Sequence, residues 1–237
     1  MSQVLSPVDQ FHNAWWQTLS QEHFKHSVGN DLARRYLSSI SPFAAIRKIS
    51  DEAFAAMEEI SHPDDVLVLM HDKPLQLPKH WNLIVRDELM TMILKKPLPE
   101  LDTAFDIQPL TLSDVPDMLA LTELTHPGPF RQDTILLGNY FGIRINGVLV
   151  AMTGERGQLA EYTEVSAVCT HPDYQGQGLA KVIVTHLCQF ILSQGKTPML
   201  RLLSTNDVAY RVYKKLGFEA LDSLTHAVRF QTRRLEV

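Results

Sequence analysis

The sequence predicts a mixed α/β fold, and three observations favour this class. The chain has 237 residues, which corresponds to one or two domains at about 150 residues each. Apolar residues make up 45% of it and charged residues 21%, which allows a sizeable core and argues against disorder. Apolar runs typical of strands also follow one another with helical patterns between them, as in a mixed sheet covered by helices.

A proline-containing segment divides the chain. The stretch from Lys95 to Thr103 holds two prolines and four charges, and it lies between two apolar strand-like segments. We therefore expect a mixed α/β domain of unknown role over residues 1–95, a linker over 96–104 and a second domain over 105–237.

The first domain contains helical and strand patterns but no recognisable chemical motif. We expect one short helix capped by Asp31, a second helix capped by Ser50, a buried strand over 66–70, and one or two strands over 82–94. Trp15 and Trp16 fit the apolar face of an amphipathic helix, which favours a core role over ligand contact.

The second domain reads as strands alternating with three helices. Ser113 can cap a first helix, and Asn146-Gly147 predicts a hairpin between strands over 140–145 and 148–153. The remaining elements are predicted as strands over 105–110, 161–170, 199–203 and 225–231, with helices after residues 178 and 206.

The turn before the helix at Leu179 predicts a phosphate-binding site. Gly176 and Gly178 let the backbone approach a ligand closely, and the first turn of the helix offers unpaired N–H groups at the positive end of its dipole. No Gly-Lys-Ser/Thr closes the turn, so it is not a Walker A loop, and Lys181 replaces the third glycine of the dinucleotide fingerprint.

Two motifs in this region resemble those of the GNAT superfamily of acyl-CoA-dependent N-acyltransferases. Gln175-Gly176-Gln177-Gly178-Leu179-Ala180 is similar to the pyrophosphate turn of the family, and residues 206–218 are similar to its second signature, Asn-x-x-Ala-x-x-x-Tyr-x-Lys-x-Gly-Phe. The resemblance covers about residues 105–237 and is closest to the FR47-like branch. The first domain could be a degenerate half-copy of the same fold.

The resemblance implies an N-acetyltransferase that moves an acetyl group from acetyl-CoA to an amine by direct attack in a ternary complex. Besides the turn at 175–180, the donor site would include Val168 and Cys169 on a bulged strand, and Asn206 at the helix start. Glutamines in the turn, where many family members have basic residues, imply that backbone N–H groups carry more of the binding.

The same resemblance implies that Tyr213 is the acid that protonates the departing thiolate, and Tyr210 is the second candidate for this role. The alternative interpretation of Tyr213 is an aromatic residue packed in the core. Strand alternation puts Glu164 on the face of Val168, where it could act as the base or be a plain strand carboxylate. Glu161 and Glu155 are the fallback bases.

The acceptor is open: a small-molecule amine, or an amine at a protein terminus or lysine. Arg131 could bind an acceptor carboxylate or be an ordinary loop arginine. A net charge of −5 argues against nucleic acid as a partner. No apolar run is long enough to span a membrane, and the amino terminus shows no secretory signal, so we expect a cytoplasmic protein. The ten histidines show no metal-ligand spacing, so we expect no metal site. A homodimer is possible.

A non-catalytic CoA-binding regulatory module is the rival function, and a protein-interaction role of the first domain is another. Cys169 lies where a thioester would bind, but a nucleophilic cysteine needs an activating cation, and only His171 lies close in sequence. A small strand residue is the simpler interpretation of Cys169.

Overall fold

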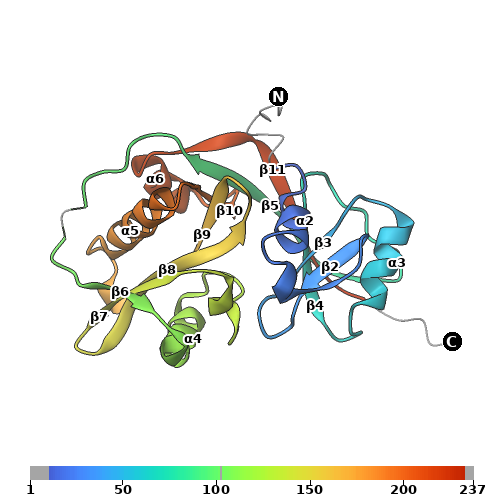
Figure 1. Cartoon of the computed structure of the whole chain (residues 1–237), viewed down its shortest axis with the longest axis horizontal. Helices are drawn as coiled ribbons and strands as arrows, with labels where there is room; N and C mark the ends of the chain where they lie inside the picture. The colour runs from blue at the N-terminus through green and yellow to red at the C-terminus, as the bar shows by residue number, and fades with distance from the viewer. Residues whose placement is uncertain (1–10, 102, 233–237) are drawn as a thin grey trace.

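The computed structural model describes residues 11–101 and 103–232, in which eleven strands form one continuous mixed sheet with helices on both faces (Figure 1). Across the sheet the order is β1-β2-β3-β4-β11-β5-β10-β9-β8-β7-β6. The strands are β1 (Ser27–Gly29), β2 (Ala33–Tyr36), β3 (Phe43–Ile46), β4 (Val66–His71), β5 (Asn82–Leu94), β6 (Ile107–Leu110), β7 (Tyr140–Ile145), β8 (Val148–Gln158), β9 (Tyr162–Thr170), β10 (Thr197–Leu203) and β11 (Phe218–Gln231). The helices are α2 (Ala14–Ser20), α3 (Asp51–Glu59), α4 (Val115–Thr125), α5 (Leu179–Ser193) and α6 (Asp207–Lys215).

Two long strands, β5 and β11, join the two halves of the sheet. β5 precedes the segment at 96–104, yet it pairs antiparallel with β10 of the second half. β11 ends the described chain, yet its last residues pair antiparallel with β4 of the first half. The two strands also pair with each other and run side by side across the molecule (Figure 1). Each half therefore gives its last strand to the other half.

The two halves repeat the same strand arrangement around this exchange. In the second half, β8 and β9 are antiparallel, and α5 links β9 to the parallel strand β10. In the first half, β2 and β3 are antiparallel, and α3 links β3 to the parallel strand β4. This order and direction are those expected of a degenerate half-copy of the second half. Strands from before and after residues 96–104 lie next to one another in the sheet, in the order β4-β11-β5-β10. The expected division into two domains at this segment stays a prediction.

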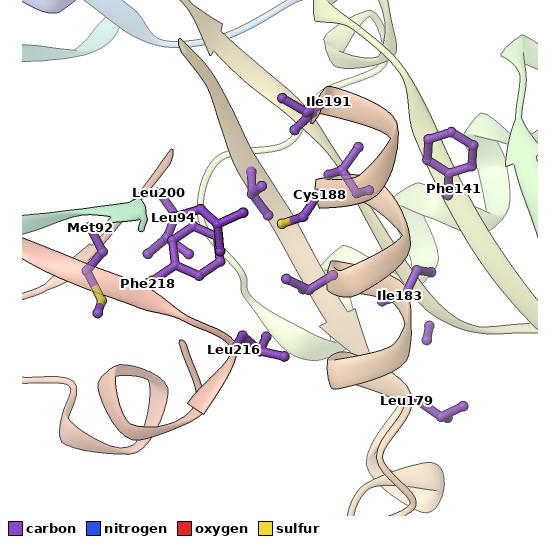
Figure 2. Close-up of a cluster of buried hydrophobic side chains, with 14 of the residues drawn as sticks. Met92, Leu94, Phe141, Leu179, Ile183, Cys188, Ile191, Leu200, Leu216 and Phe218 are labelled. Atoms are coloured by element: carbon purple, nitrogen blue, oxygen red, sulfur yellow. The ribbon is translucent and has the colours of Figure 1, made fainter. Parts of the chain in front are cut away.

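The largest core cluster lies under α5. Leu179, Ile183, Leu187 and Ile191 are almost completely buried on the predicted apolar face of this helix. They pack on residues of the sheet such as Phe218 (Figure 2). Burial of each such side chain contributes about 1.5–3 kcal/mol, so this cluster holds the start of α5 in place.

Most elements of the sequence analysis are found, and the helix predicted after Asp31 is wrong. Residues 33–36 form strand β2, because the Asn30 side chain accepts hydrogen bonds from the backbone N–H groups of Leu32 and Ala33 and closes a hairpin with β1. The helical spacing of apolar residues here arose from a strand followed by a turn. The hairpin at Asn146-Gly147 is confirmed, with φ of +51° and +82°.

The helix caps agree in part. Ser50 caps α3 as expected, since its hydroxyl accepts a hydrogen bond from the N–H of Ala53. Ser113 does not cap the next helix. Thr111 and Asp114 instead form a capping box on the 3₁₀ turn at 112–114 that leads into α4, in which the Asp114 carboxylate accepts from the N–H of Thr111 at 2.8 Å.

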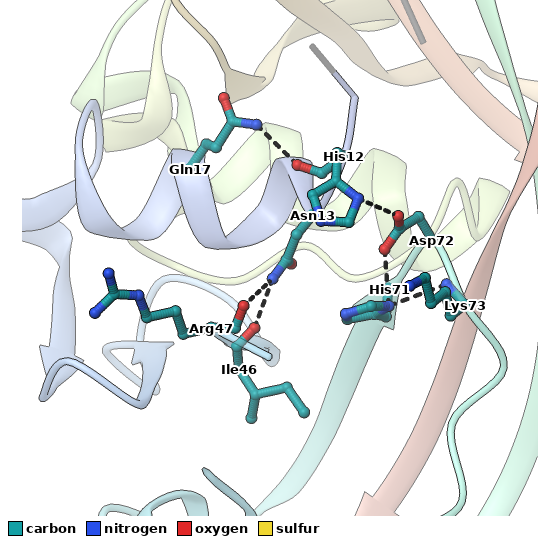
Figure 3. A network of polar contacts seen from close by, with 8 residues as sticks. All are labelled: His12, Asn13, Gln17, Ile46, Arg47, His71, Asp72 and Lys73. Atoms are coloured by element: carbon teal, nitrogen blue, oxygen red, sulfur yellow. Dashed lines mark hydrogen bonds and ion pairs between the residues drawn. The ribbon is translucent and has the colours of Figure 1, made fainter. Parts of the chain in front are cut away.

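Helix α2 sits between the halves and is fixed by polar contacts at its start (Figure 3). The Asp72 carboxylate lies 2.6 Å from Nδ1 of His12 and 2.8 Å from Nδ1 of His71. The Asn13 amide donates to the backbone carbonyl of Ile46 at 2.7 Å. Trp15 is only 2% exposed, which confirms its core role. Residues 1–10, which carried much of the secretory-signal analysis, lie outside the described residues. In the described part, no helix is both long and apolar enough to cross a bilayer.

A buried histidine beside α2 makes stability depend on pH. The His23 ring lies 2.7 Å from the Tyr36 hydroxyl, and burial together with the nearby His26 lowers the pKa of His23 to about 4. The unfolded chain, with a histidine pKa of about 6.5, takes up this proton first as the pH falls. The free energy of unfolding should therefore decrease between about pH 6.5 and pH 4, by at most about 1.4 kcal/mol per pH unit from this group.

Urea denaturation across this pH range measures the slope. His23→Gln should reduce it, whereas the same change at the exposed His62 should leave it as in the wild type. Equal slopes in all three proteins would contradict the assignment.

Candidate functional site

Strands β9 and β10 separate partway along their length and open a cavity. They pair in parallel from Tyr162 opposite Thr197 to Glu164 opposite Met199, where the pairing ends. Beyond this point, residues 165–168 of β9 and 200–203 of β10 line a cavity of about 510 Å3. The start of α6 and the loop at 125–129 complete this central cavity.

A bulge interrupts β9 just beyond the point where its pairing with β10 ends. Cys169 pairs with Met152 and Ser166 with Gly154, so Ala167 and Val168 both face Thr153 of β8. Ala167 has a φ of +49°, in the left-handed region. The bulge turns the backbone of residues 167 and 168, both of which line the central cavity, out of regular strand geometry.

The bulge also changes which face of the sheet each side chain occupies. Val165 and Val168 both pack in the cluster under α5, whereas Ala167 and Cys169 pack in the cluster with α4. The expectation that Glu164 shares a face with Val168 is therefore wrong, since simple alternation does not continue through residues 167 and 168.

Glu164 is fully buried between two arginines. Its Oε1 lies 2.8 Å from Nη2 of Arg156 and 3.1 Å from Nη1 of Arg201, and its Oε2 accepts from the N–H of Gly157 at 3.2 Å. Burial alone would raise the pKa of this carboxyl, but Arg156 and Arg201 outweigh burial and lower the pKa to about 2. A carboxylate with this pKa and these partners is poorly suited to take a proton from an amine at neutral pH.

Aromatic rings of the first half cover this ion cluster. The guanidinium carbon of Arg156 lies 5.0 Å from the ring centre of Phe43, and that of Arg201 lies 5.7 Å from the ring centre of Trp15. Both distances allow cation–π attraction in a buried setting. The ion cluster thus connects the two halves at the point where β9 and β10 part.

The fallback bases do not line the central cavity. Glu155 is buried and accepts two hydrogen bonds at 2.8 Å from the backbone and side-chain amides of Asn139. Glu161 is exposed at the turn before β9. Within the described ranges, no three His, Cys, Asp or Glu side chains are grouped to hold a metal ion.

The turn before α5 exposes its backbone through two glycines. Gly176 and Gly178 have φ of +77° and +79°, and a Cβ added to either would meet no atom within 4 Å. Gln175 and Gln177 are exposed, and α5, a helix of 15 residues, has no acidic residue in its first turn. Backbone N–H groups at the positive end of a long helix are thus open to an anion.

Helix α6 brings the second motif to the central cavity. The Asn206 side chain accepts from the N–H of Ala209 at 3.0 Å and caps the helix, and Ala209 and Tyr213 line the cavity. Burial, with smaller contributions from the nearby Cys188 and Cys169, raises the pKa of Tyr213 to about 12. Its hydroxyl therefore keeps its proton at all ordinary pH values.

Cys169 is buried, and burial raises the pKa of its thiol to about 11 against the opposing hydrogen bond of Thr125. The thiolate required of a nucleophile is not formed at neutral pH. This supports the interpretation of Cys169 as a small strand residue.

A second, outer cavity of about 780 Å3 lies between α4 with the loop at 126–131 and the strands β4 and β11. Arg131 lines it, and its guanidinium donates to the backbone carbonyl of Ser38. Arg229 lines both cavities, and Asp87 lines the central one. The sequence analysis missed Asp87 and Arg229, because only the pairing of β5 with β11 brings them to the site.

Replacement of Glu164 should mainly affect stability. Glu164→Gln leaves Arg156 and Arg201 buried without a counter-charge, which should lower the free energy of unfolding by about 3–5 kcal/mol. The exposed Glu161→Gln should change it by less than about 0.5 kcal/mol. Urea denaturation of the two variants measures the difference, and equal stabilities would show that the ion cluster does not hold the halves together.

Comparisons with known proteins identify the family of this chain. The family model described as FR47-like protein matches residues 140–228, which run from β7 into β11. An acetyltransferase of Pectobacterium atrosepticum is 30% identical over 95 residues, which are 39% of this chain and 62% of that protein. The chain thus matches less than two thirds of the length of this curated relative.

Solved structures cover nearly the whole chain. A crystal structure from Novosphingobium aromaticivorans, assigned as an acetyltransferase of the GNAT family, is 31% identical and has a TM-score of 0.86 over 95% of this chain and 99% of that one. A GCN5-related N-acetyltransferase of Kribbella flavida, 16% identical, shares the fold with a TM-score of 0.62 over 92% and 95% of the two chains. The two signature motifs, the bulged and separated strands and these similarities together show that the chain belongs to the GNAT superfamily, in its FR47-like branch.

Proposed function

We propose that this chain is an N-acetyltransferase that moves an acetyl group from acetyl-CoA to an amine by direct attack. The observation that carries the proposal is the separation of β9 from β10 beside the bulge at 167–168, in one cavity with Tyr213. Family membership supports the reaction class, and the open glycine turn before α5 supports the donor.

The residues present fit acetyl-CoA. The N–H groups of the turn at 175–180 would hold its pyrophosphate, with the exposed Lys181 as a charge partner in the first turn of α5. The backbone of Val168 and Cys169 would hold the pantetheine arm and the thioester. When bound, acetyl-CoA supplies the acyl carbon that the amine attacks and the thiol that leaves.

Tyr213 serves as the acid in this scheme. As the C–S bond breaks, the Tyr213 hydroxyl donates its proton to the sulfur, which a phenol with a pKa of about 12 does only in concert with the departure of the thiolate. Glu164 acts differently from the expectation: it positions β8, β9 and β10 through Arg156 and Arg201.

Acetyl-CoA should stabilise the protein through the glycine turn. At a hundred times its Kd, a ligand adds about 2.7 kcal/mol, which is roughly 5–10 °C in Tm for a chain of this size. Gly178→Glu should abolish the shift, because the carboxylate would point into the open space before α5.

Gly195→Glu is the matched control for this experiment. Gly195 has a φ of +75° and equally open surroundings, but it follows the other end of α5. Both variants carry similar backbone strain, so only the first should lose the shift in thermal unfolding. No shift in the wild type at millimolar acetyl-CoA would contradict the proposed function.

Tyr213→Phe separates a catalyst from a binding module. It should lower kcat by about a hundredfold or more, because general acids contribute at least about this factor, and it should leave the acetyl-CoA-induced Tm shift unchanged. Tyr210→Phe, on the same helix, should retain activity. Thiol release from acetyl-CoA with a panel of amines gives the rates, and unchanged turnover in Tyr213→Phe would remove this residue from the mechanism.

A further inference from the structure

We propose that the acceptor is an amine that carries an anionic group, that Asp87 binds and deprotonates its amine, and that Arg229 binds its anion. The inference rests on the proposed function and adds the chemical class of the acceptor. It assigns acceptor recognition to β5 and β11, the two strands exchanged between the halves.

The register of three strands places these side chains on one face. Asp87 on β5 pairs with Ala227 on β11, which pairs with Met70 on β4. Arg229 lies two residues further along β11, beside Val68 on β4. All five residues line the central cavity, so this sheet face is one of its walls. The first half of the chain therefore builds part of the acceptor site.

Asp87 and Arg229 are diagonal neighbours across the β5–β11 ladder. Such neighbours have separations of about 7–8 Å between their backbones, and these two are not within ion-pair distance of each other. Among the described residues, neither makes an ion pair or a side-chain hydrogen bond. By contrast, Arg156 and Arg201, which also line the cavity, are paired with Glu164.

Asp87 lies nearer to Tyr213 than Arg229 does along the cavity, which suits an acceptor whose amine reacts and whose anion points outward. The N–H of Ser204 donates to the carbonyl of Glu88 at 2.9 Å, so Asp87 lies beside the end of β10, where α6 begins and leads to Tyr213. Arg229 lines both the central and the outer cavity, and so lies toward the open side. An amine at Asp87 would thus be near the reacting end of the donor, with its anion pointing outward to Arg229.

Asp87 also supplies the proton acceptor that Glu164 does not. The acceptor enters as an ammonium ion, and the Asp87 carboxylate takes one proton from it, directly or through water. The nitrogen lone pair then forms the C–N bond as the C–S bond breaks and Tyr213 protonates the departing sulfur. The nitrogen loses its second proton as the amide forms, and this proton restores the Tyr213 hydroxyl. Asp87 returns its own proton to solvent. His126 on the loop at 125–129 also lines the cavity and is the competing proton acceptor.

The first test compares acceptors that differ only in charge. The ω-amino acids from glycine to 5-aminopentanoate, their carboxamides, and 2-aminoethyl phosphate are assayed for thiol release from acetyl-CoA. For at least one chain length, the wild type should prefer the anion over the carboxamide by tenfold or more in kcat/KM. The phosphate compound shows whether the anion site prefers a carboxylate.

Arg229→Met should remove this preference, because it should lower kcat/KM for the anionic acceptors by more than it changes kcat/KM for the carboxamides. Asp87→Asn should lower kcat/KM for all acceptors by about a hundredfold at neutral pH and less at high pH, where the free amine is already neutral. Asp87→Glu should restore part of the activity. A purely structural role of Asp87 would not change the pH profile.

Several results would overturn the inference. Equal use of acids and carboxamides by the wild type, or a preference that survives in Arg229→Met, excludes the anion site while leaving acetyl transfer intact. A larger loss in His126→Gln than in Asp87→Asn excludes Asp87 as the base. Absence of transfer to the whole series also overturns the inference, and the acetyl-CoA shift abolished by Gly178→Glu then decides separately whether the donor site stands.

Discussion

The ion cluster of Glu164 with Arg156 and Arg201 is the constraint on which the rest of the structure depends. Burial of three charges is tolerated only because each oxygen of the carboxylate has donors within 3.2 Å. The cluster sits at the last paired residue of β9 and β10, so it fixes where the strands part and where the cavity begins. The rings of Trp15 and Phe43 pack on the two arginines and so fix the first half of the chain against the second at this point.

The features that could be predicted from sequence are those that depend on neighbours along the chain. The glycine turn before α5, the cap at Asn206, the helix after Ser50 and the hairpin at Asn146 are local, and the structure has all of them. The role of Glu164 could not be predicted in this way, because it depends on residues of neighbouring strands. Its partners come from β8 and β10, and the bulge at 167–168 reverses the alternation on which the interpretation of its face was based. Asp87 likewise gained its place only from strand pairing over long distances in sequence.

Similar halves differ in whether they can bind an anion. In the second half, glycines precede a helix without acidic residues in its first turn. In the first half, the corresponding helix α3 starts with its N–H groups partly satisfied by Ser50, and Asp51 and Glu52 occupy its first turn. Two carboxylates at the positive end of a helix repel a phosphate. The first half thus has the strand arrangement without an open anion site, and Asp87 of its strand β5 lines the cavity of the other half.

The exchange of β5 and β11 has a consequence for how the chain folds. The partner of β4 arrives from more than half the chain length away, and β11 is the last strand of the described chain. Contacts of such high sequence separation slow folding, and during synthesis one edge of the apolar strand β4 stays without its neighbour until residues 226–231 have been made. An open, apolar edge is also where strands of two different molecules join. The architecture that shares one cavity between the halves therefore leaves this edge of β4 available to a strand of another molecule until β11 has been made and paired.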